Sequence, residues 1–169
     1  MESDEHGEYP EGEGWYILNA VKGRWSTNPA FGNWIGFEGV PRFEDFGVNI
    51  HVLEPGQPAC KYHNENCQEG FLVLSGNCRL LVEGEERILE AWDYFHCPSG
   101  TSHVLVGGEG GPCAVLMIGR RSAEMKYEYP ASELAGKYGA SAATTTNDPR
   151  EAYAGRPESG HMSSPWPLP

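Results

Sequence analysis

Between residues 47 and 120 the chain alternates between short apolar runs and turn-forming residues. The runs are rich in β-branched and aromatic residues, and Gly, Pro or Asn separates them, which is typical of β-strands. They are Val48–Leu53, Gly70–Leu74, Cys78–Val82, Glu86–Leu89, Tyr94–Cys97, His103–Val106 and Cys113–Ile118. Because the connections are short, we expect antiparallel pairing, with a hairpin turn at Glu83–Glu85. The pattern predicts an all-β fold that closes into a barrel or sandwich.

The segments on either side of this region differ from it in composition. The first 14 residues carry six carboxylates and no Lys or Arg, so residues 1–14 are expected to form a mobile acidic N-terminus. Residues 15–120 are expected to form the barrel, with an aromatic-rich extension of strands and loops at its start. Residues 121–169 are expected to contain short helical turns, near residues 130–140 and 147–153, and an extended tail.

The charge and the apolar patterning exclude several classes of partner. The chain has 24 acidic and 12 basic residues and a formal net charge of −12, which disfavours nucleic acid and anionic membranes as partners. Its longest apolar stretches fall far below the ~20 residues of a spanning helix. The acidic start lacks the features of a secretory signal, and five cysteines without a CxxC pair are typical of reduced thiols. We therefore predict a cytoplasmic protein.

Polar residues interrupt the strand pattern at residues 62–69 and 98–103. His63 and Glu65 stand two apart, so an extended strand places both on one face, and Glu69 can join them if the chain turns or stays in phase. With His103 at the head of a later strand, the set offers two imidazoles and two carboxylates for a divalent transition metal. On spacing alone, surface carboxylates and hydrogen-bonded structural histidines are the more common interpretation, and the flanking pattern is what favours a metal site.

Further residues near these segments are candidates for lining a cavity. His51 and His96 lie inside predicted strands and are candidates for acid/base groups or for contacts to the metal ligands; ordinary packed histidines are the alternative. Tyr62 flanks the ligand segment. Gln68 stands beside Glu69, and in a strand it would point to the opposite face.

Two stretches resemble the paired motifs of the cupin superfamily. The first motif reads Gly, five residues, His, one residue, His, three or four residues, Glu, six residues, Gly. Its counterparts here are Gly56, His63, Glu65, Glu69 and Gly76, with six residues after the first Gly. The second reads Gly, five residues, Pro, one residue, Gly, two residues, His. Its counterparts are Pro98, Gly100 and His103, with Trp92 in place of the leading Gly.

This resemblance covers residues 47–118 and implies a cupin β-barrel, a jelly-roll-like fold of two packed antiparallel sheets that is usually a homodimer. It transfers metal-ligand positions to His63, Glu69 and His103. Glu65 stands where the family has its second His, so the implied set is two His and two Glu; the alternative is that Glu65 points elsewhere and three ligands remain. The extra carboxylate hardens the site and favours Zn, Mn or Fe over Cu.

The resemblance also implies a metal-binding protein that binds or acts on a small oxygen-bearing molecule. As an enzyme it would be a metal-dependent isomerase, lyase or oxygenase, with no catalytic residue assigned. The alternatives are a non-catalytic cupin that binds or senses a small ligand, and a structural barrel without metal. A base beside the metal, for which His51 and His96 are the candidates, would favour the enzyme. The fold alone does not decide among these functions.

Overall fold

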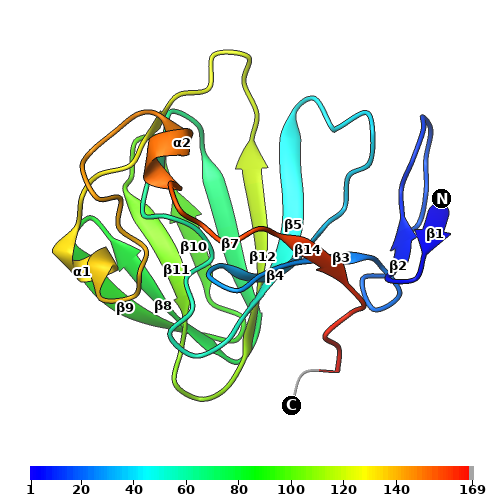
Figure 1. Ribbon diagram of the computed structural model, residues 1–169, viewed down its shortest axis with the longest axis horizontal. Coiled ribbons are helices and arrows are strands. Elements are labelled where there is room, and N and C mark those ends of the chain that lie inside the picture. The colour runs from blue at the N-terminus through cyan, green and yellow to red at the C-terminus, as the bar shows by residue number, and fades with distance from the viewer. Residues whose placement is uncertain (168–169) are drawn as a thin grey trace.

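The computed structural model describes residues 1–167, and β-strands dominate it (Figure 1). In chain order its elements are β1 (Glu2–Asp4), β2 (Gly7–Tyr9), β3 (Trp25–Asn28), β4 (Gly32–Gly36), β5 (Phe46–Leu53), β6 (Asn64–Glu65), β7 (Glu69–Ser75), β8 (Asn77–Val82), β9 (Glu85–Glu90), β10 (Tyr94–Cys97), β11 (His103–Gly107), β12 (Cys113–Arg120), β13 (Tyr127–Glu128), α1 (Glu133–Gly136), α2 (Pro149–Ala152) and β14 (Gly160–Met162).

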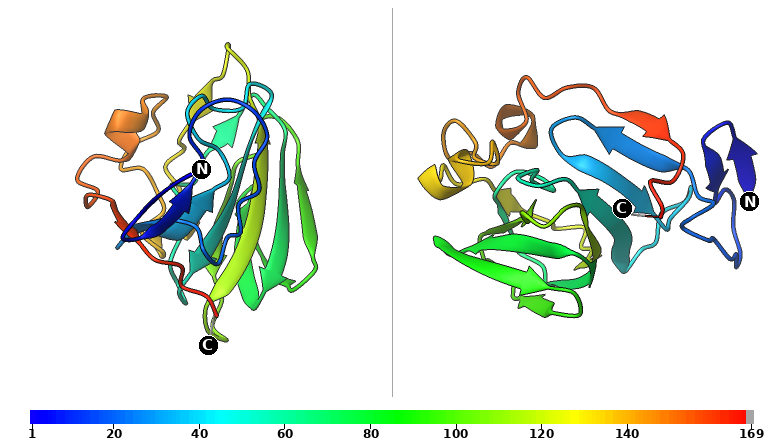
Figure 2. Two further views of the ribbon diagram at one scale, coloured as in Figure 1. Left: turned by 90° about the vertical axis from the view of Figure 1, so that its right-hand side faces the viewer. Right: turned by 90° about the horizontal axis from the view of Figure 1, so that it is seen from below.

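A larger and a smaller antiparallel sheet face each other to form the barrel (Figure 2). The larger sheet has the order β10-β7-β12-β5-β4-β3-β14, and the smaller has the order β11-β8-β9. Leu53, Val73 and Val115 of the larger sheet share one buried cluster with Leu80 and Leu105 of the smaller sheet. The predicted all-β fold, a cupin barrel of packed antiparallel sheets, is confirmed.

The strands of the barrel lie where the sequence pattern predicts them, with ends within two residues of the expected positions. The predicted turn between β8 and β9 has Glu83 at φ 49° and Gly84 at φ 80°, as a two-residue hairpin requires. Trp92, which replaces the leading Gly of the second motif, has φ 77°. The backbone conformation that favours glycine is therefore present although the residue is Trp.

The outer faces of both sheets are partly covered by chain from outside the barrel. The smaller sheet packs against the region of α1 through a buried cluster that contains Tyr62, Leu81, Val104, Val106, Ala135 and Ala140. The larger sheet carries a cluster of Trp25, Ile35, Val52 and Ala114, against which Leu18 and Trp166 pack. The extensions are thus tied to the barrel by apolar contacts.

The ends of the chain contain short elements. Ser132 caps α1 and Asp148 caps α2, with Pro149 in the first turn, so both predicted helical turns are present. β1 and β2 form a hairpin at the opposite end of the molecule from these helices (Figure 1). The mobility of residues 1–14 and the boundaries at residues 14 and 120 stay predictions, and residues 168–169 of the tail lie outside the described residues. Within residues 1–167, no helix is long and apolar enough to cross a membrane.

Candidate metal centre

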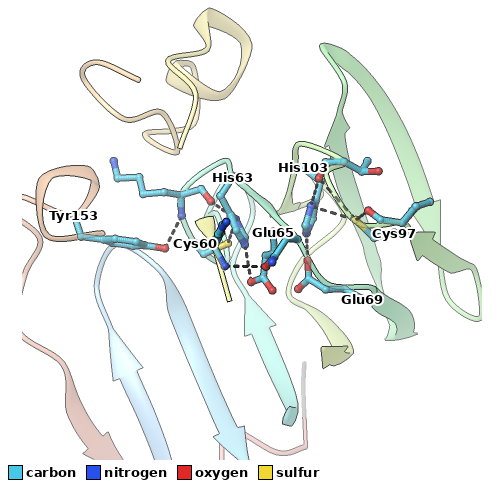
Figure 3. A network of polar contacts seen from close by, with 12 residues as sticks. Cys60, His63, Glu65, Glu69, Cys97, His103 and Tyr153 are labelled. Atoms are coloured by element: carbon cyan, nitrogen blue, oxygen red, sulfur yellow. Dashed lines mark hydrogen bonds and ion pairs between the residues drawn. The ribbon is translucent and has the colours of Figure 1, made fainter. Parts of the chain in front are cut away.

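The backbone holds His63 and His103 side by side, although they are far apart in the sequence. The His63 amide donates to the His103 carbonyl at 3.1 Å, and the His103 amide donates to the His63 carbonyl at 2.8 Å. This antiparallel bridge places the two imidazole centroids 5.1 Å apart. The two polar segments predicted from the sequence therefore meet at one end of the barrel interior (Figure 3).

Each imidazole is oriented by a hydrogen bond from its Nδ1 atom. His63 Nδ1 lies 2.8 Å from the Lys61 carbonyl oxygen, and His103 Nδ1 lies 3.1 Å from the Thr101 carbonyl oxygen. A carbonyl only accepts, so Nδ1 carries the proton in both rings and donates it. Once Nε2 has lost its proton, it offers a lone pair toward the cavity, which is how metal-binding histidines are usually held.

Both Nε2 atoms face carboxylates at a distance suited to a shared ion. His63 Nε2 lies 3.4 Å from Glu65 Oε1, and His103 Nε2 lies 3.4 Å from Glu69 Oε2. Two donors bound to Zn²⁺ at about 2.0–2.1 Å with a tetrahedral angle lie about 3.4 Å apart. The donor spacing and the mixture of nitrogen and oxygen donors therefore fit a divalent transition metal.

His63, Glu69 and His103 form the compact part of the predicted ligand set. One ligand atom from each lies within 4.8 Å of the other two. Glu65 borders His63 but is not part of this group of three. The structure thus brings all four predicted residues into one cavity, with Glu65 beside His63 and outside the compact group of three.

The environment shifts the protonation of these groups in different directions. Burial, and then the charge of Glu65, raise the pKa of Glu69 to about 7. Burial, and then the charge of His63, lower the pKa of His103 to about 4. Burial also opposes the charge on His63, but Cys60, Glu65 and Glu69 outweigh it, so the pKa of His63 lies well above its usual value. Without metal, the cluster therefore retains protons at neutral pH.

The cluster opens into a cavity of about 190 Å³. Glu69, Gly119 and Gly47 are register partners on adjacent strands β7, β12 and β5, and all three line the cavity. Since two of these three positions carry no side chain, a hollow extends from Glu69 across the sheet. Arg121 stands over Gly47 at the rim and forms a paired salt bridge with Glu38.

The other predicted cavity residues lie elsewhere. His51 lines a separate cavity of about 150 Å³ and stacks on Trp34, with ring centroids 5.8 Å apart. Tyr62 is packed in the cluster beneath α1. Gln68 and His96 are exposed, and neither lines the cavity that contains the cluster. The sequence therefore located the two polar segments that meet in this cavity better than the residues around them.

Several residues that line the cavity were not singled out by the sequence analysis. They are Gly47, Asn49, Cys60, Phe71, Met117 and Gly119. The sequence could have identified Asn49, because it is a polar residue in an apolar strand. It lies on the same face of that strand as Leu53, and the Leu53 side chain is fully buried. The role of Gly47 and Gly119 in forming the cavity depends on strand register, which places them in one row with Glu69.

Comparisons with known proteins agree with the fold. Residues 49–119 match the family model described as "Cupin domain". No curated protein sequence matches the chain. A putative sugar phosphate isomerase from Acidithiobacillus ferrooxidans is 25% identical over 51% of this chain and 56% of its own, with a TM-score of 0.49. Thus the chain matches little more than half of that protein.

Two other solved structures are similar over about two thirds of the chain. A sugar phosphate isomerase from a cupin superfamily, from Silicibacter pomeroyi, is 24% identical over 66% of this chain and 68% of its own, with a TM-score of 0.54. The polyketide cyclase RemF from Streptomyces resistomycificus is 15% identical over 66% of this chain and 83% of its own, with a TM-score of 0.56. At these identities the likeness shows the fold alone.

Proposed function

Because this chain is a cupin-domain protein, we propose that it binds one divalent transition-metal ion, Zn, Mn or Fe, through His63, Glu69 and His103. The observation that carries this proposal is that one ligand atom each of His63, Glu69 and His103 lies within 4.8 Å of the other two, with His103 Nε2 at 3.4 Å from Glu69 Oε2. When bound, the ion would supply a Lewis acid that polarises an oxygen atom of a ligand.

The chain's own residues position and enclose this site. The Lys61 and Thr101 carbonyls fix the imidazole rings, and Phe71 packs against the His103 ring with centroids 5.1 Å apart. Tyr129 stacks on the other side of the pair, 5.8 Å from the His63 ring. Rings held on several sides lose little entropy on binding, so the site is preorganised.

We assign Glu65 a role in proton transfer, beside the three ligands. Its side chain is 12% exposed and borders His63 in the cavity, and it is not part of the compact ligand group. A carboxylate in this position can accept a proton from a carbon next to a polarised carbonyl, or return it. This supports an enzyme of the isomerase or lyase type, and it gives Glu65 the role of the base for which His51 and His96 were the sequence candidates.

The expected partner is a small oxygen-bearing molecule. The cavity of about 190 Å³ joins the polar cluster to apolar surface from Phe71 and Met117, a composition typical of small-molecule sites. The names of the similar solved structures, a sugar phosphate isomerase and a polyketide cyclase, describe reactions of oxygen-containing compounds. The proposal for this chain, however, depends on its own cavity.

Metal analysis tests the proposal directly. The purified protein should bind about one Zn²⁺ per chain in a calorimetric titration, and elemental analysis should give the same stoichiometry. His63→Ala, His103→Ala and Glu69→Gln should each weaken binding by about two orders of magnitude or more, because each removes one of few donors. His96→Ala is the matched control, since His96 is exposed and outside the cavity, and it should bind as the native chain does. Native protein that takes up no metal would contradict the proposal.

Glu65→Gln separates the two roles of that residue. A proton-transfer group should leave Zn²⁺ affinity within about threefold of the native value, whereas a fourth ligand should lower it by tenfold or more. The second result would restore Glu65 to the ligand set expected from the sequence and would remove the support for its role as a base.

We further propose a homodimer that forms through the outer face of the larger sheet. Phe46 of β5, Ile118 of β12 and Tyr94 of β10 lie on this face and are 44%, 44% and 62% exposed; β5 and β12 are neighbours, and β7 separates β12 from β10. An apolar patch of this kind on a sheet is typical of a protein interface. The native chain should sediment as a dimer, and Ile118→Glu should give a folded monomer; a native monomer at micromolar concentration would refute this assembly.

A further inference from the structure

We propose that Asn49 is the residue that selects the ligand of the metal cavity, by accepting a hydrogen bond from a hydroxyl group that lies several bonds from the oxygen held at the metal. The ligand class is a small hydroxylated carboxylic acid. This inference rests on the proposed metal site, because the metal anchors the other end of the ligand.

The first observation is an unpaired acceptor in the cavity wall. Asn49 Oδ1 is buried and has no hydrogen-bond partner among the described residues. Asn49 lines the same cavity as His63 and Glu69. A buried carboxamide oxygen without a partner is costly to the fold, and native proteins rarely retain one without a role. Rotation of the carboxamide about its last side-chain bond would turn this oxygen into the cavity, where a bound hydroxyl group would supply the missing donor.

Strand register places this acceptor away from the metal ligands. On the interior face, Asn49 of β5 pairs with Met117 of β12, which pairs with Phe71 of β7. Glu69 is two residues from Phe71 on β7, so β12 lies between the strands that carry Asn49 and Glu69. Adjacent strands are about 4.8 Å apart, so the two backbones are separated by about 10 Å. A ligand that reaches both residues needs its polar ends several bonds apart.

Charge and lining define the rest of the ligand. Two imidazoles and the Glu69 carboxylate leave one positive charge on a divalent ion, and an anionic oxygen of the ligand would neutralise this charge in competition with the Glu65 carboxylate, which borders the same site. Phe71 and Met117 stand between the two ends and favour a short apolar segment. Arg121 at the rim is already neutralised by Glu38, and therefore the anionic end is expected at the metal.

Zn²⁺-loaded protein and two matched pairs of probes test this inference: 3-hydroxypropionate against propionate, and 4-hydroxybutyrate against butyrate. After Zn²⁺ binding has been measured, the dissociation constant of each acid is determined by calorimetry. At least one hydroxy acid should bind tenfold or more tightly than its partner that lacks the hydroxyl group. In Asn49→Val the preference should fall below twofold, with unchanged Zn²⁺ affinity.

The same variant has a second readout. Because Asn49→Val removes the unpaired acceptor, its metal-free form should melt about 3–8 °C above the native chain. Asn33→Val is the matched control on β4, outside the cavity, and should leave the hydroxyl preference intact. If valine does not fit, Asn49→Ala tests the same loss of preference.

The possible results are distinguishable. Equal binding within both pairs, or a preference that persists in Asn49→Val and Asn49→Ala, would overturn the role of Asn49. Native protein that binds no Zn²⁺ would overturn the proposed metal site, and this inference with it. Zn²⁺ binding without hydroxyl selectivity would overturn the inference alone.

Discussion

Acidification should destabilise this protein through His51, a histidine outside the proposed metal site. Its Nδ1 atom is buried and has no hydrogen-bond partner among residues 1–167. The ring stacks on Trp34, and Tyr153 and Arg156 line the cavity beside it. Burial lowers the pKa of His51 from 6.5 to about 4, because the charged imidazolium would lose its hydration there and Nδ1 has no hydrogen-bond partner among the described residues.

The sign and size of the effect follow from proton linkage. In the unfolded chain the ring binds a proton below pH 6.5, whereas the folded protein binds it only near pH 4. Between these values the unfolded state holds more protons, so stability is complete above pH 6.5 and falls as the pH falls. At 1.36 kcal/mol per pKa unit, the loss between pH 7 and pH 5 is about 2 kcal/mol, and it approaches about 3 kcal/mol at pH 4.

Urea denaturation of the native chain and of His51→Phe, at pH values from 7 to 4.5, measures this contribution. Phenylalanine can keep the stack on Trp34 and does not titrate. His103, which also has a lowered pKa, is present in both proteins and cancels in the comparison. The native chain should lose about 2 kcal/mol more than the variant between pH 7 and 5, or about 4–8 °C in Tm. Parallel losses in the two proteins would refute the assignment to His51.

Further predictions concern the rim, a strained turn and the metal site. In Gly47→Ala the new Cβ would lie 3.2 Å from the Arg121 side chain, so the salt bridge to Glu38 should loosen and urea denaturation should show a loss of about 1 kcal/mol; unchanged stability would mean that the rim adapts. Trp92→Gly should be about 1 kcal/mol more stable than Trp92→Ala, because only glycine relieves a φ of 77°, and equal melting temperatures would contradict this strain. Zn²⁺ affinity should fall as pH decreases below 7, where Glu69 gains a proton that the metal must displace, and this pH dependence should weaken in Glu69→Gln.

The strands were predictable because their signals are local. An apolar run between turn residues specifies β5, β7, β8 and β12 within two residues of their observed ends. Glu83–Gly84 likewise specifies its own hairpin, since the required positive φ angles depend on the residues of the turn. The polar segment at residues 62–69 was predictable for the same reason, as His63 and Glu65 are spaced to share a face.

The surroundings of the site depend on register, which a short pattern does not specify. A shift by one residue would turn Gln68 inward and Glu69 outward, and only the pairing of β7 with β12 fixes the observed choice. His51 shares its face with Asn49, yet Ala59 lies between the cavities that the two residues line. Tyr62 precedes His63, so its side chain points to the opposite face of the chain. There it packs in a cluster with Ala135 and Ala140, and a short sequence pattern does not predict a contact between such distant residues.

The interior face of the larger sheet explains why a cavity exists at one end of the barrel and a packed core at the other. Toward the core end, Val73, Val115 and Leu53 fill the interior, and each is fully buried. Toward the site, the row from Glu69 contains Gly119 and Gly47, so the volume that side chains would fill is left to a ligand. The hollow coincides with the groups that are expensive to bury: retained protons on the cluster and the unpaired oxygen of Asn49. A fold selected for stability alone would carry valine or isoleucine at positions 47 and 119. The cavity that the two glycines leave beside polar groups is therefore the feature of this sequence that most directly indicates a binding function.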